Sequence, residues 1–475
     1  MAKFNSTTTI KTTNKSGHAA YGMTDKAKLI TQVLCSFFNE SKFYGDNSEE
    51  MKQLIQKVVA SDPEFVAKLA VFARKEFNMR SVSHVLLAYL AHDVNGKPFT
   101  RNAVKAACLR GDDATEIMAC YLNMFGKPIP NALRKGLSDV LQGFSEYTLA
   151  KYASKGKAVK MRDLLCLCRP TPKNEAQSDL WKRCLEDRLE TPMTWETELS
   201  AKGNTTEVWE NLIASGKIGY MALLKNLRNI LNAKPSNLDI VLDTIKNTEA
   251  VKRSRLLPFR FLSAYKEVQL IGTSRVFDAL EDAVEASIDN MPQLPGTTVI
   301  AVDVSGSMTD KISAKSNVRC FEIAMLLGLM ANKICEDSVF YVFNNRISKA
   351  AVSKRNGILY TASHTGANGG TDMKLPFRAM MSDNINADRV IILSDNECNY
   401  YGWNTPVQKL ADEYRKASGN DIWVHAIDLQ GYGTQQFHGK KTNIIAGWSE
   451  KVLEFIRLAE MGEGSLEEAI KNYTF

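Results

Sequence analysis

The stretch Thr297–Asp310, TTVIAVDVSGSMTD, decides the fold class of this chain. Its first half is a continuous apolar, β-branched run that ends in an acid, which is typical of a strand buried on both faces of a parallel sheet. Its second half is small and polar, which predicts a turn directly after the strand. Parallel sheets bind ligands at the carboxyl ends of their strands, so this turn is a candidate site.

Three side chains in the turn have oxygen atoms at alternate positions, namely Asp303, Ser305 and Ser307. Gly306 between the serines allows a backbone conformation that a side chain would resist. Thr371 lies in a later Gly-Gly-Thr-Asp segment, and Asp395 follows a second apolar run, so both could complete the same shell. Such hard oxygen donors favour Mg²⁺, with Mn²⁺ or Ca²⁺ as alternatives, over zinc or copper.

Two other interpretations of the turn are weaker. Ser-Gly-Ser could be a plain turn with Asp303 as a helix cap, but three matching segments at strand ends favour a metal site. An aspartyl phosphotransferase would need a carboxylate where Ser305 stands, and the sequence has no G-x-x-x-x-G-K-[ST] phosphate loop. A hydrolase would need a general base, and the candidate metal site has no His or spare carboxylate placed as one. We therefore predict that the chain is not an enzyme.

The chain on either side of residue 290 has two different periodicities. From residue 297 onward, strands predicted at 297–303, 338–343, 388–394 and 421–428 alternate with helices at 317–335, 373–382, 405–417 and from 449, which indicates a doubly wound parallel sheet. Residues 24–290, which precede this sheet region, have apolar residues at helical spacing almost throughout. Predicted helices there include 81–91, 100–110, 131–141, 206–214, 220–231 and 273–289, with Thr24 and the Ser61-Pro63-Glu64 box as starts of two others. Many short helices without strands favour an α-helical, HEAT-like solenoid over a single bundle.

Composition sets the broad class. The chain has 475 residues, of which 44% are hydrophobic and 24% charged, so we expect a globular, cytoplasmic protein with two or three domains. No apolar run is long enough to cross a membrane, and residues 1–22 are polar, which predicts a flexible N-terminal arm and no secretory signal. Nine cysteines, mostly within apolar patterns, indicate free core thiols. The close pair Cys166 and Cys168 is weak evidence for zinc.

The net charge of +7 is unevenly distributed. Residues 1–275 contain 41 basic against 28 acidic side chains, whereas residues 291–475 contain 19 against 20. The basic excess therefore belongs to the helical part, which is the asymmetry expected when one domain meets a polyanion.

The order of a helical solenoid and a sheet domain with this site resembles the Ro (TROVE) family of RNA-binding proteins. The segments at 303–308, 369–372 and 394–397 resemble the metal-ion-dependent adhesion site of the family's von Willebrand factor A domain. Val208-Trp209, the run Met221–Leu227 and Arg255–Phe259 resemble further family motifs. The likeness covers nearly the whole chain and implies three parts: a flexible arm (1–22), a helical TROVE-type region (23–290) and an A domain (291–475).

The family implies a monomeric ring of helical repeats closed by the A domain. It also implies binding of small non-coding Y RNAs and of the single-stranded 3′ ends of misfolded RNAs, in RNA quality control or as part of a ribonucleoprotein. An exoribonuclease or another protein could meet the metal site. The segment Asp163–Pro172 resembles another motif of the family but differs from it at Arg169, where the family has His. This difference argues against an RNA contact identical to that of the family.

Basic side chains in two runs, and in the pair Lys225 and Arg228 one helical turn apart, are the candidate RNA contacts, because such clusters neutralise phosphates whatever the base. They are Lys151, Lys155, Lys157, Lys160, Arg162, Arg169, Lys225, Arg228, Arg253 and Arg255. The alternative for any one cluster is an ordinary solvated helix face. Trp181, Trp209, Phe259 and Tyr265 are better explained as core than as stacking platforms. The competing function is a metal-dependent protein-binding module with the helical region as a spacer.

Overall fold

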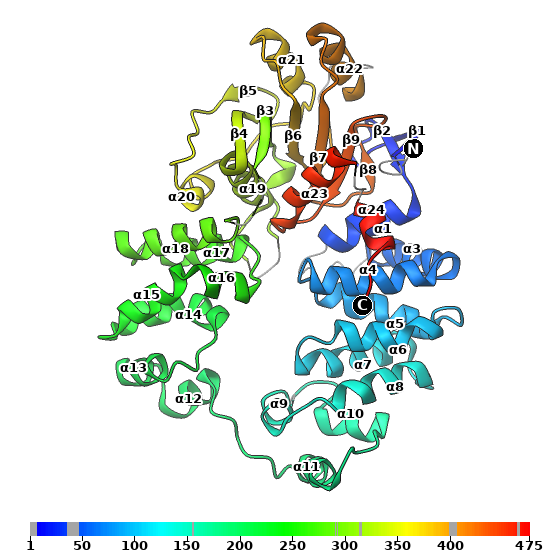
Figure 1. Ribbon diagram of the computed structural model, residues 1–475, viewed down its shortest axis with the longest axis vertical. Helices are drawn as coiled ribbons and strands as arrows, with labels where there is room; N and C mark the ends of the chain where they lie inside the picture. Colours follow the sequence, from blue (N-terminus) through cyan, green and yellow to red (C-terminus); the bar gives the residue numbers. More distant parts are fainter. Residues whose placement is uncertain are drawn as a thin grey trace. The chain divides into compact units, whose positions relative to one another are not determined.

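A computed structural model describes residues 7–35, 47–153, 156–289, 291, 293–312, 316–398, 406–462 and 466–475. Most of the chain before residue 290 is helical, and a six-stranded sheet follows (Figure 1). The chain divides into two compact units. One unit comprises Met1–Asn39 with Glu198–Glu468, and the other comprises Glu40–Thr197 with Ala469–Phe475. The predicted boundaries at 22 and 290 do not coincide with the ends of these units, and the three-part division stays a prediction.

The helical part consists of short helices, as the periodicity predicts. They are α1 (Asp25–Cys35), α3 (Asn47–Ser61), α4 (Pro63–Lys75), α5 (Ser81–His92), α6 (Lys97–Ala107), α7 (Gly111–Phe125), α8 (Asn131–Leu141), α9 (Glu146–Lys151), α10 (Met161–Cys168), α11 (Glu175–Leu185), α12 (Trp195–Lys202), α13 (Thr206–Ala214), α14 (Tyr220–Ala233), α15 (Leu238–Lys246), α16 (Thr248–Ser254), α17 (Phe259–Val268) and α18 (Ser274–Ala286). Thr24 accepts a hydrogen bond from the Ala27 amide, and Asp62, not Ser61, caps α4. The predicted helix residues Phe37 and Phe38 lie outside the described residues.

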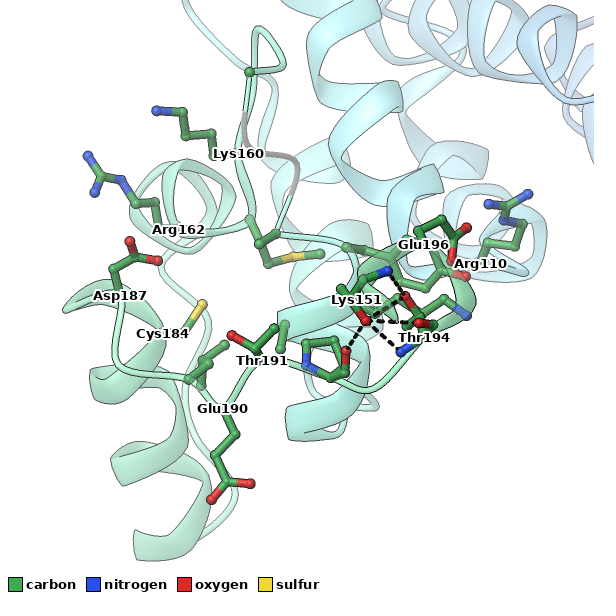
Figure 2. A pocket seen from close by; sticks show the side chains of 18 residues that line it. Arg110, Lys151, Lys160, Arg162, Cys184, Asp187, Glu190, Thr191, Thr194 and Glu196 are labelled. Carbon is green, nitrogen blue, oxygen red and sulfur yellow. Dashed lines mark hydrogen bonds between the residues drawn. The ribbon is translucent and has the colours of Figure 1, made fainter. Parts of the chain in front are cut away.

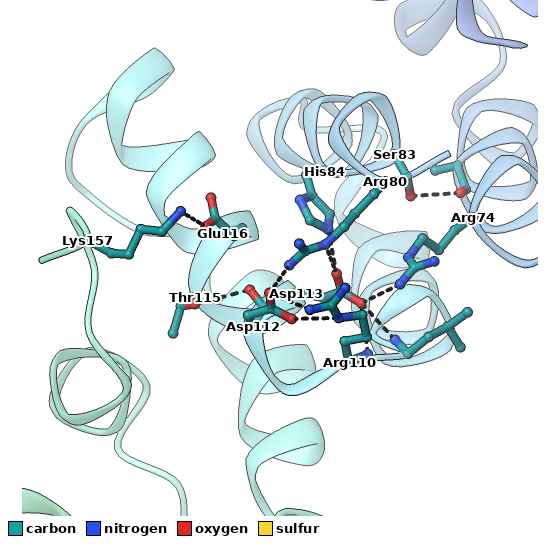
Figure 3. A network of polar contacts seen from close by, with 12 residues as sticks. Arg74, Arg80, Ser83, His84, Arg110, Asp112, Asp113, Thr115, Glu116 and Lys157 are labelled. Atoms are coloured by element: carbon teal, nitrogen blue, oxygen red, sulfur yellow. Dashed lines mark hydrogen bonds and ion pairs between the residues drawn. The ribbon is translucent and has the colours of Figure 1, made fainter. Parts of the chain in front are cut away.

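A buried ion-pair network joins three helices of the Glu40–Thr197 unit (Figure 3). Asp113 of α7 is fully buried and accepts from Arg74 of α4 at 2.9 Å and from Arg80, just before α5, at 2.6 Å. His84 of α5 lies 3.2 Å from the same carboxylate. Burial acts to raise the pKa of Asp113, but the hydrogen bond from His84 and the two guanidinium charges hold it well below its usual range. The network therefore fixes the packing of α4, α5 and α7.

The sheet domain has strand order β5-β4-β3-β6-β7-β9. Its strands are β3 (Leu294–Asp303), β4 (Cys335–Phe343), β5 (Ile347–Lys349), β6 (Arg389–Ser394), β7 (Trp423–Asp428) and β9 (Thr442–Ala446), parallel except for β5. Its helices are α19 (Cys320–Ile334), α20 (Ile358–Ser363), α21 (Leu375–Ser382), α22 (Val407–Ser418), α23 (Lys451–Met461) and α24 (Leu466–Lys471), with a 3-10 turn at Ser307–Thr309. The order reverses at β3, which pairs with β4 on one side and β6 on the other. A ligand crevice is expected at this switch point.

The described part of the N-terminal arm, residues 7–22, belongs to a β-hairpin, contrary to the expectation of a flexible segment. Strands β1 (Thr7–Thr13) and β2 (Ala19–Met23) form an antiparallel hairpin, and β2 pairs with β8 (Thr434–Gln435) of the sheet domain. The register places Tyr21 opposite Gln435 and Gly22 opposite Thr434. The sequence prediction was wrong here because the apolar stretch of β2 is only five residues long, and its partner β8 is distant in sequence.

The last helices before the sheet domain contact it within the same compact unit. Lys266 of α17 forms an ion pair with Glu322 of α19 at 2.6 Å. Glu281 of α18 accepts from the backbone amides of Leu359 (3.1 Å) and Tyr360 (2.8 Å) at the start of α20. The buried side chains Trp209, Phe259 and Tyr265 belong to the core of this unit, and Trp181 is buried in the other, as predicted. Closure of the helices into a ring stays a prediction.

All nine cysteines are free thiols, in agreement with the sequence prediction. Cys166 is exposed and Cys168 is buried, so the pair does not share one face of α10. Among the described residues, no helix is long and apolar enough to cross a membrane.

Candidate metal centre and nucleic-acid interface

The carboxyl end of β3 holds the first three predicted metal donors. Asp303 is fully buried, and its Oδ1 accepts from the Ser305 amide at 2.8 Å while its Oδ2 accepts from the Ser394 hydroxyl at 2.6 Å. The hydroxyl oxygens of Ser305 and Ser307 lie 3.1 Å apart. The turn thus brings one carboxylate and two hydroxyls together, as the alternating pattern predicts.

The segment that carries Thr371 packs against this turn. The Gly306 amide donates to Gly369 O at 2.8 Å, and the Asn368 amide donates to Val304 O at 2.8 Å. Gly306 has an ordinary φ of −62°, so the predicted need for an unusual backbone conformation was wrong. Glycine is favoured there because the segment of Gly369 approaches closely, and a Cβ at residue 306 would lie 3.1 Å from Gly369 O. Thr371 itself is fully buried.

Asp395 follows β6, the strand beside β3, and is also fully buried. Its Oδ1 accepts from the Glu397 amide at 3.1 Å, whereas its Oδ2 has no hydrogen-bond partner among the described residues. A buried carboxylate oxygen without a donor is costly unless something positive binds it.

The electrostatics of the two acids fit a cation. Burial, followed by repulsion from Asp395, raises the pKa of Asp303 to about 7. Burial also raises the pKa of Asp395, against the effect of the nearby Ser307 hydroxyl. Two like charges in one dry site destabilise each other, and a divalent cation would remove that repulsion. The described residues hold no group of three or more His, Cys, Asp or Glu side chains suited to a metal, so hydroxyls are needed to complete this shell.

Two acidic residues beside this site were missed by sequence reasoning. Asp428 ends β7, and burial raises its pKa to about 7 although the amides of Gln430 and Gly431 donate to it. The strand 421–428 ends in this acid, so the signal that identified Asp395 was present there too. Glu397 is buried and bonds to the N-terminal hairpin, a contact that no local pattern indicates.

The first basic run lines a cavity of about 700 Å³ within the Glu40–Thr197 unit (Figure 2). Lys160 and Arg162 lie together at one edge beside Asp187, and Lys151 and Arg110 lie on the other side. We call this the Lys151 cavity. Tyr147 is 51% exposed, and its ring lies 5.4 Å from the Lys151 ammonium, so a cation and an aromatic face occur side by side. Both are typical partners of single-stranded nucleic acid.

Lys157 and Arg169 of this run do not line the cavity. Lys157 forms an ion pair with Glu116 at 3.0 Å, and Lys155 lies outside the described residues. Arg169 is exposed at the C-terminal end of α10 with a φ of 48°. The structure therefore brings together three of the six predicted residues and adds Arg110, which the sequence analysis did not single out.

The pair Lys225 and Arg228 lines a separate groove in the other compact unit. Lys225 and Arg228 of α14 line a cavity of about 440 Å³ with Arg260 of α17. Burial lowers the pKa of Arg260 to about 10, and Arg228 forms an ion pair with Glu267 at 2.8 Å. Arg253 and Arg255 are exposed at the end of α16 and do not line this groove.

Comparison with known proteins identifies the class and then the family. The fold places the chain in the class of proteins that have a helical region followed by a von Willebrand factor A-type domain. The chain matches the TROVE domain over residues 22–188 and 181–275 and the Ro60 vWA domain over residues 297–457. The chain therefore belongs to the TROVE family, as its motifs indicated.

Individual relatives are distant. The chain is 24% identical to Telomerase protein component 1 of Rattus norvegicus over 335 residues, which is 51% of this chain and 13% of that protein. It is 28% identical to RNA-binding protein RO60 of Caenorhabditis elegans over 249 residues, 48% of this chain and 38% of that protein. The matches thus span less than half of either relative. The fold is similar to the crystal structure of the Deinococcus radiodurans RO (RSR) protein, with a TM-score of 0.61, 17% identity and coverage of 93% and 100% of the two chains.

Proposed function

We propose that this chain is an RNA-binding scaffold for small structured non-coding RNA of the Y RNA type and for single-stranded 3′ ends. The observation that carries the proposal is the Lys151 cavity, where three of the predicted basic residues meet in one place. Membership of the TROVE family and the name of the relative RNA-binding protein RO60 support it. The role would be non-enzymatic, in RNA quality control or within a ribonucleoprotein.

The two basic sites would have different tasks. The Lys151 cavity combines ammonium and guanidinium groups with Tyr152 in its lining, and Tyr147 lies beside Lys151, so the site suits a strand whose bases are free to stack. The groove of Lys225, Arg228 and Arg260 has no tyrosine or tryptophan in its lining and suits phosphates alone. In a cytoplasmic monomer closed as a ring, the family arrangement, both sites would serve one RNA.

The sheet domain would hold a divalent cation, Mg²⁺ before Mn²⁺ or Ca²⁺. Asp303, Ser305, Ser307, Thr371 and Asp395 would be its ligands, directly or through water, because all offer hard oxygen atoms. When bound, the cation supplies a positive charge that can accept a carboxylate from a partner. The residues themselves orient the site through the Ser394 and Ser305 bonds to Asp303.

The second candidate is a metal-dependent protein-binding module, in which the helical region is a spacer. The buried pair Asp303 and Asp395 favours it, because such a pair has no evident use in gripping RNA. The two functions are compatible, and an exoribonuclease is the kind of partner that the proposed RNA role would place at the metal.

Charge reversal tests the RNA proposal. We expect Lys160→Glu, Arg162→Glu and Arg169→Glu together to weaken binding of most RNA sequences alike, because phosphate contacts carry no base information. In a fluorescence anisotropy titration against salt, the slope of log affinity would fall by about 2, since each phosphate neutralised on a single strand contributes roughly 0.7 to that slope. Lys349→Glu, Lys409→Glu and Lys416→Glu, exposed lysines of the sheet domain, form the matched control. Equal weakening in both triple variants would show a general charge effect and remove this surface from the account.

A further inference from the structure

The hairpin β1–β2 contacts the loop that carries Asp395, although some 380 residues separate them in sequence. The hairpin and the sheet domain belong to one compact unit. Beyond the pairing of β2 with β8, the tip of the hairpin reaches the residues just after β6. The tip is closed by the Asn14 amide, which donates to His18 O, and by the Gly17 amide, which donates to Asn14 O.

The tip binds both carboxylate oxygens of Glu397. The Lys15 amide donates to Oε1 at 3.2 Å, and the Ser16 amide and hydroxyl donate to Oε2 at 3.0 and 3.2 Å. Glu397 is only 2% exposed. Because three donors occupy its two oxygens, Glu397 serves as an anchor for the loop and not as a metal ligand.

A second contact fixes the loop one residue further on. The Asn14 side chain is buried, and its Nδ2 donates to Cys398 O at 3.0 Å, while its Oδ1 accepts from the His18 amide at 2.8 Å. The Lys15 ammonium also lies 4.4 Å from the centre of the Tyr432 ring, in the segment that leads into β8. The tip is therefore held on two sides of the loop.

The anchored residues act directly on Asp395. The Glu397 amide donates to Asp395 Oδ1 at 3.1 Å. Between them, Asn396 has a φ of 58°, in the left-handed region that Asn adopts more readily than most residues, and its carbonyl accepts from Gln436 Nε2 at 3.0 Å. Gln436 directly follows β8, the strand with which the hairpin pairs. A loop in this conformation keeps its shape only when its surroundings hold it.

We propose that the N-terminal hairpin positions Asp395 for the divalent cation, so that residues 14–16 are part of the metal centre. The inference rests on the proposed cation and goes beyond its ligand set. Residues that orient a ligand from behind typically change metal affinity by about 10- to 100-fold when they are substituted. By thermodynamic reciprocity, the cation in turn holds the hairpin on the loop.

The test uses the full chain and Mg²⁺ alone, measured by titration calorimetry. We expect Glu397→Gln and Asn14→Ala each to weaken Mg²⁺ binding by about tenfold or more. Lys11→Ala, an exposed position on β1 of the same hairpin, is the matched control and keeps the wild-type affinity. Wild-type Mg²⁺ affinity in both Glu397→Gln and Asn14→Ala would overturn the inference. Absence of Mg²⁺ binding in the wild-type chain would instead overturn the proposed cation itself.

Hydrogen exchange supplies a readout that does not depend on a variant folding well. In the wild-type chain, Mg²⁺ is expected to slow exchange of the Lys15 and Ser16 amides, which donate to Glu397. Asp303→Ala removes the cation without touching the hairpin and so abolishes the slowing. If Mg²⁺ protects the Asp395 loop but leaves exchange at residues 15 and 16 unchanged, the hairpin is not coupled to the metal centre.

Discussion

At the scale of single residues, Asp303 and Asp395 carry the case for a metal. They end neighbouring strands, both are fully buried, and burial raises the pKa of each. An ion-free site of this kind destabilises the fold, so a bound cation contributes to stability as well as to binding. The spacing of Asp303, Ser305 and Ser307 made these donors predictable, because a strand end and a turn are local features. Asp428 ends a predicted strand and had the same local signal as Asp395, whereas the role of Glu397 depends on contacts made in the folded chain.

Asp303→Ala is the direct test at this scale. In the wild-type chain we expect Mg²⁺ at one hundred times its dissociation constant to stabilise the fold by about 2.7 kcal/mol, seen as a rise in melting temperature. The variant loses the central carboxylate and shows no such rise, while its RNA affinity is unchanged because the basic sites lie elsewhere. Asp337→Ala, at an exposed position near the start of β4, controls for loss of an acid. A Mg²⁺-dependent rise that persists in Asp303→Ala would contradict the ligand assignment.

At the scale of elements, the sequence predicted the strands and helices whose hydrophobic pattern lies entirely within the element. The apolar runs of β3 and β6 and the amphipathic helices fall close to their expected ranges. Strands β5 and β8 have three and two residues, too few to show any period. Strand β1 is a run of Thr with one Ile and one Lys, and β2 has only five residues, so neither shows a clear alternation, and the pairing partners of the hairpin come from β8 and Glu397. What local periodicity cannot supply is a partner that is distant in sequence.

The packing of α4, α5 and α7 depends on Asp113. Asp113→Asn leaves Arg74 buried beside a neutral amide, and breaking a buried pair in this way costs about 3–5 kcal/mol. Asp139→Asn, which removes the partly buried partner of the exposed Arg101, is the control and changes the melting temperature little. Similar melting temperatures for the two variants would show that the network is not structural.

The same network makes stability depend on pH. The pKa of Asp113 is lowered on folding, so its contribution is lost as acid protonates it. Burial lowers the pKa of His84, so the unfolded chain takes up a proton below about pH 6.5 that the folded chain does not. Both effects reduce stability as the pH falls. We expect the wild-type melting temperature to decrease from pH 7 to pH 5 by more than that of His84→Gln, and a steeper decrease in the variant would contradict the assignment.

At the scale of the whole molecule, the charge distribution and the TROVE match both favour the helical part, and not the sheet domain, as the part that binds RNA. The basic excess lies in residues 1–275, which include the Lys151 cavity and the groove of Lys225, Arg228 and Arg260. The near-neutral sheet domain carries the candidate metal centre. Tyr152 lines the cavity and the exposed Tyr147 lies beside Lys151, and these rings are the basis for proposing a free strand as the ligand in preference to a duplex.

The most direct test of the central claim compares two RNAs that share one structured body, one with a single-stranded 3′ tail and one blunt-ended. Their affinities for the full chain are measured by competition at a fixed salt concentration near physiological, because electrostatic affinities depend on salt. The account predicts that the tailed RNA binds at least about tenfold more tightly, since each base stacked on an aromatic ring contributes about 1–3 kcal/mol. Equal affinity for the two RNAs, or binding to neither, would contradict it.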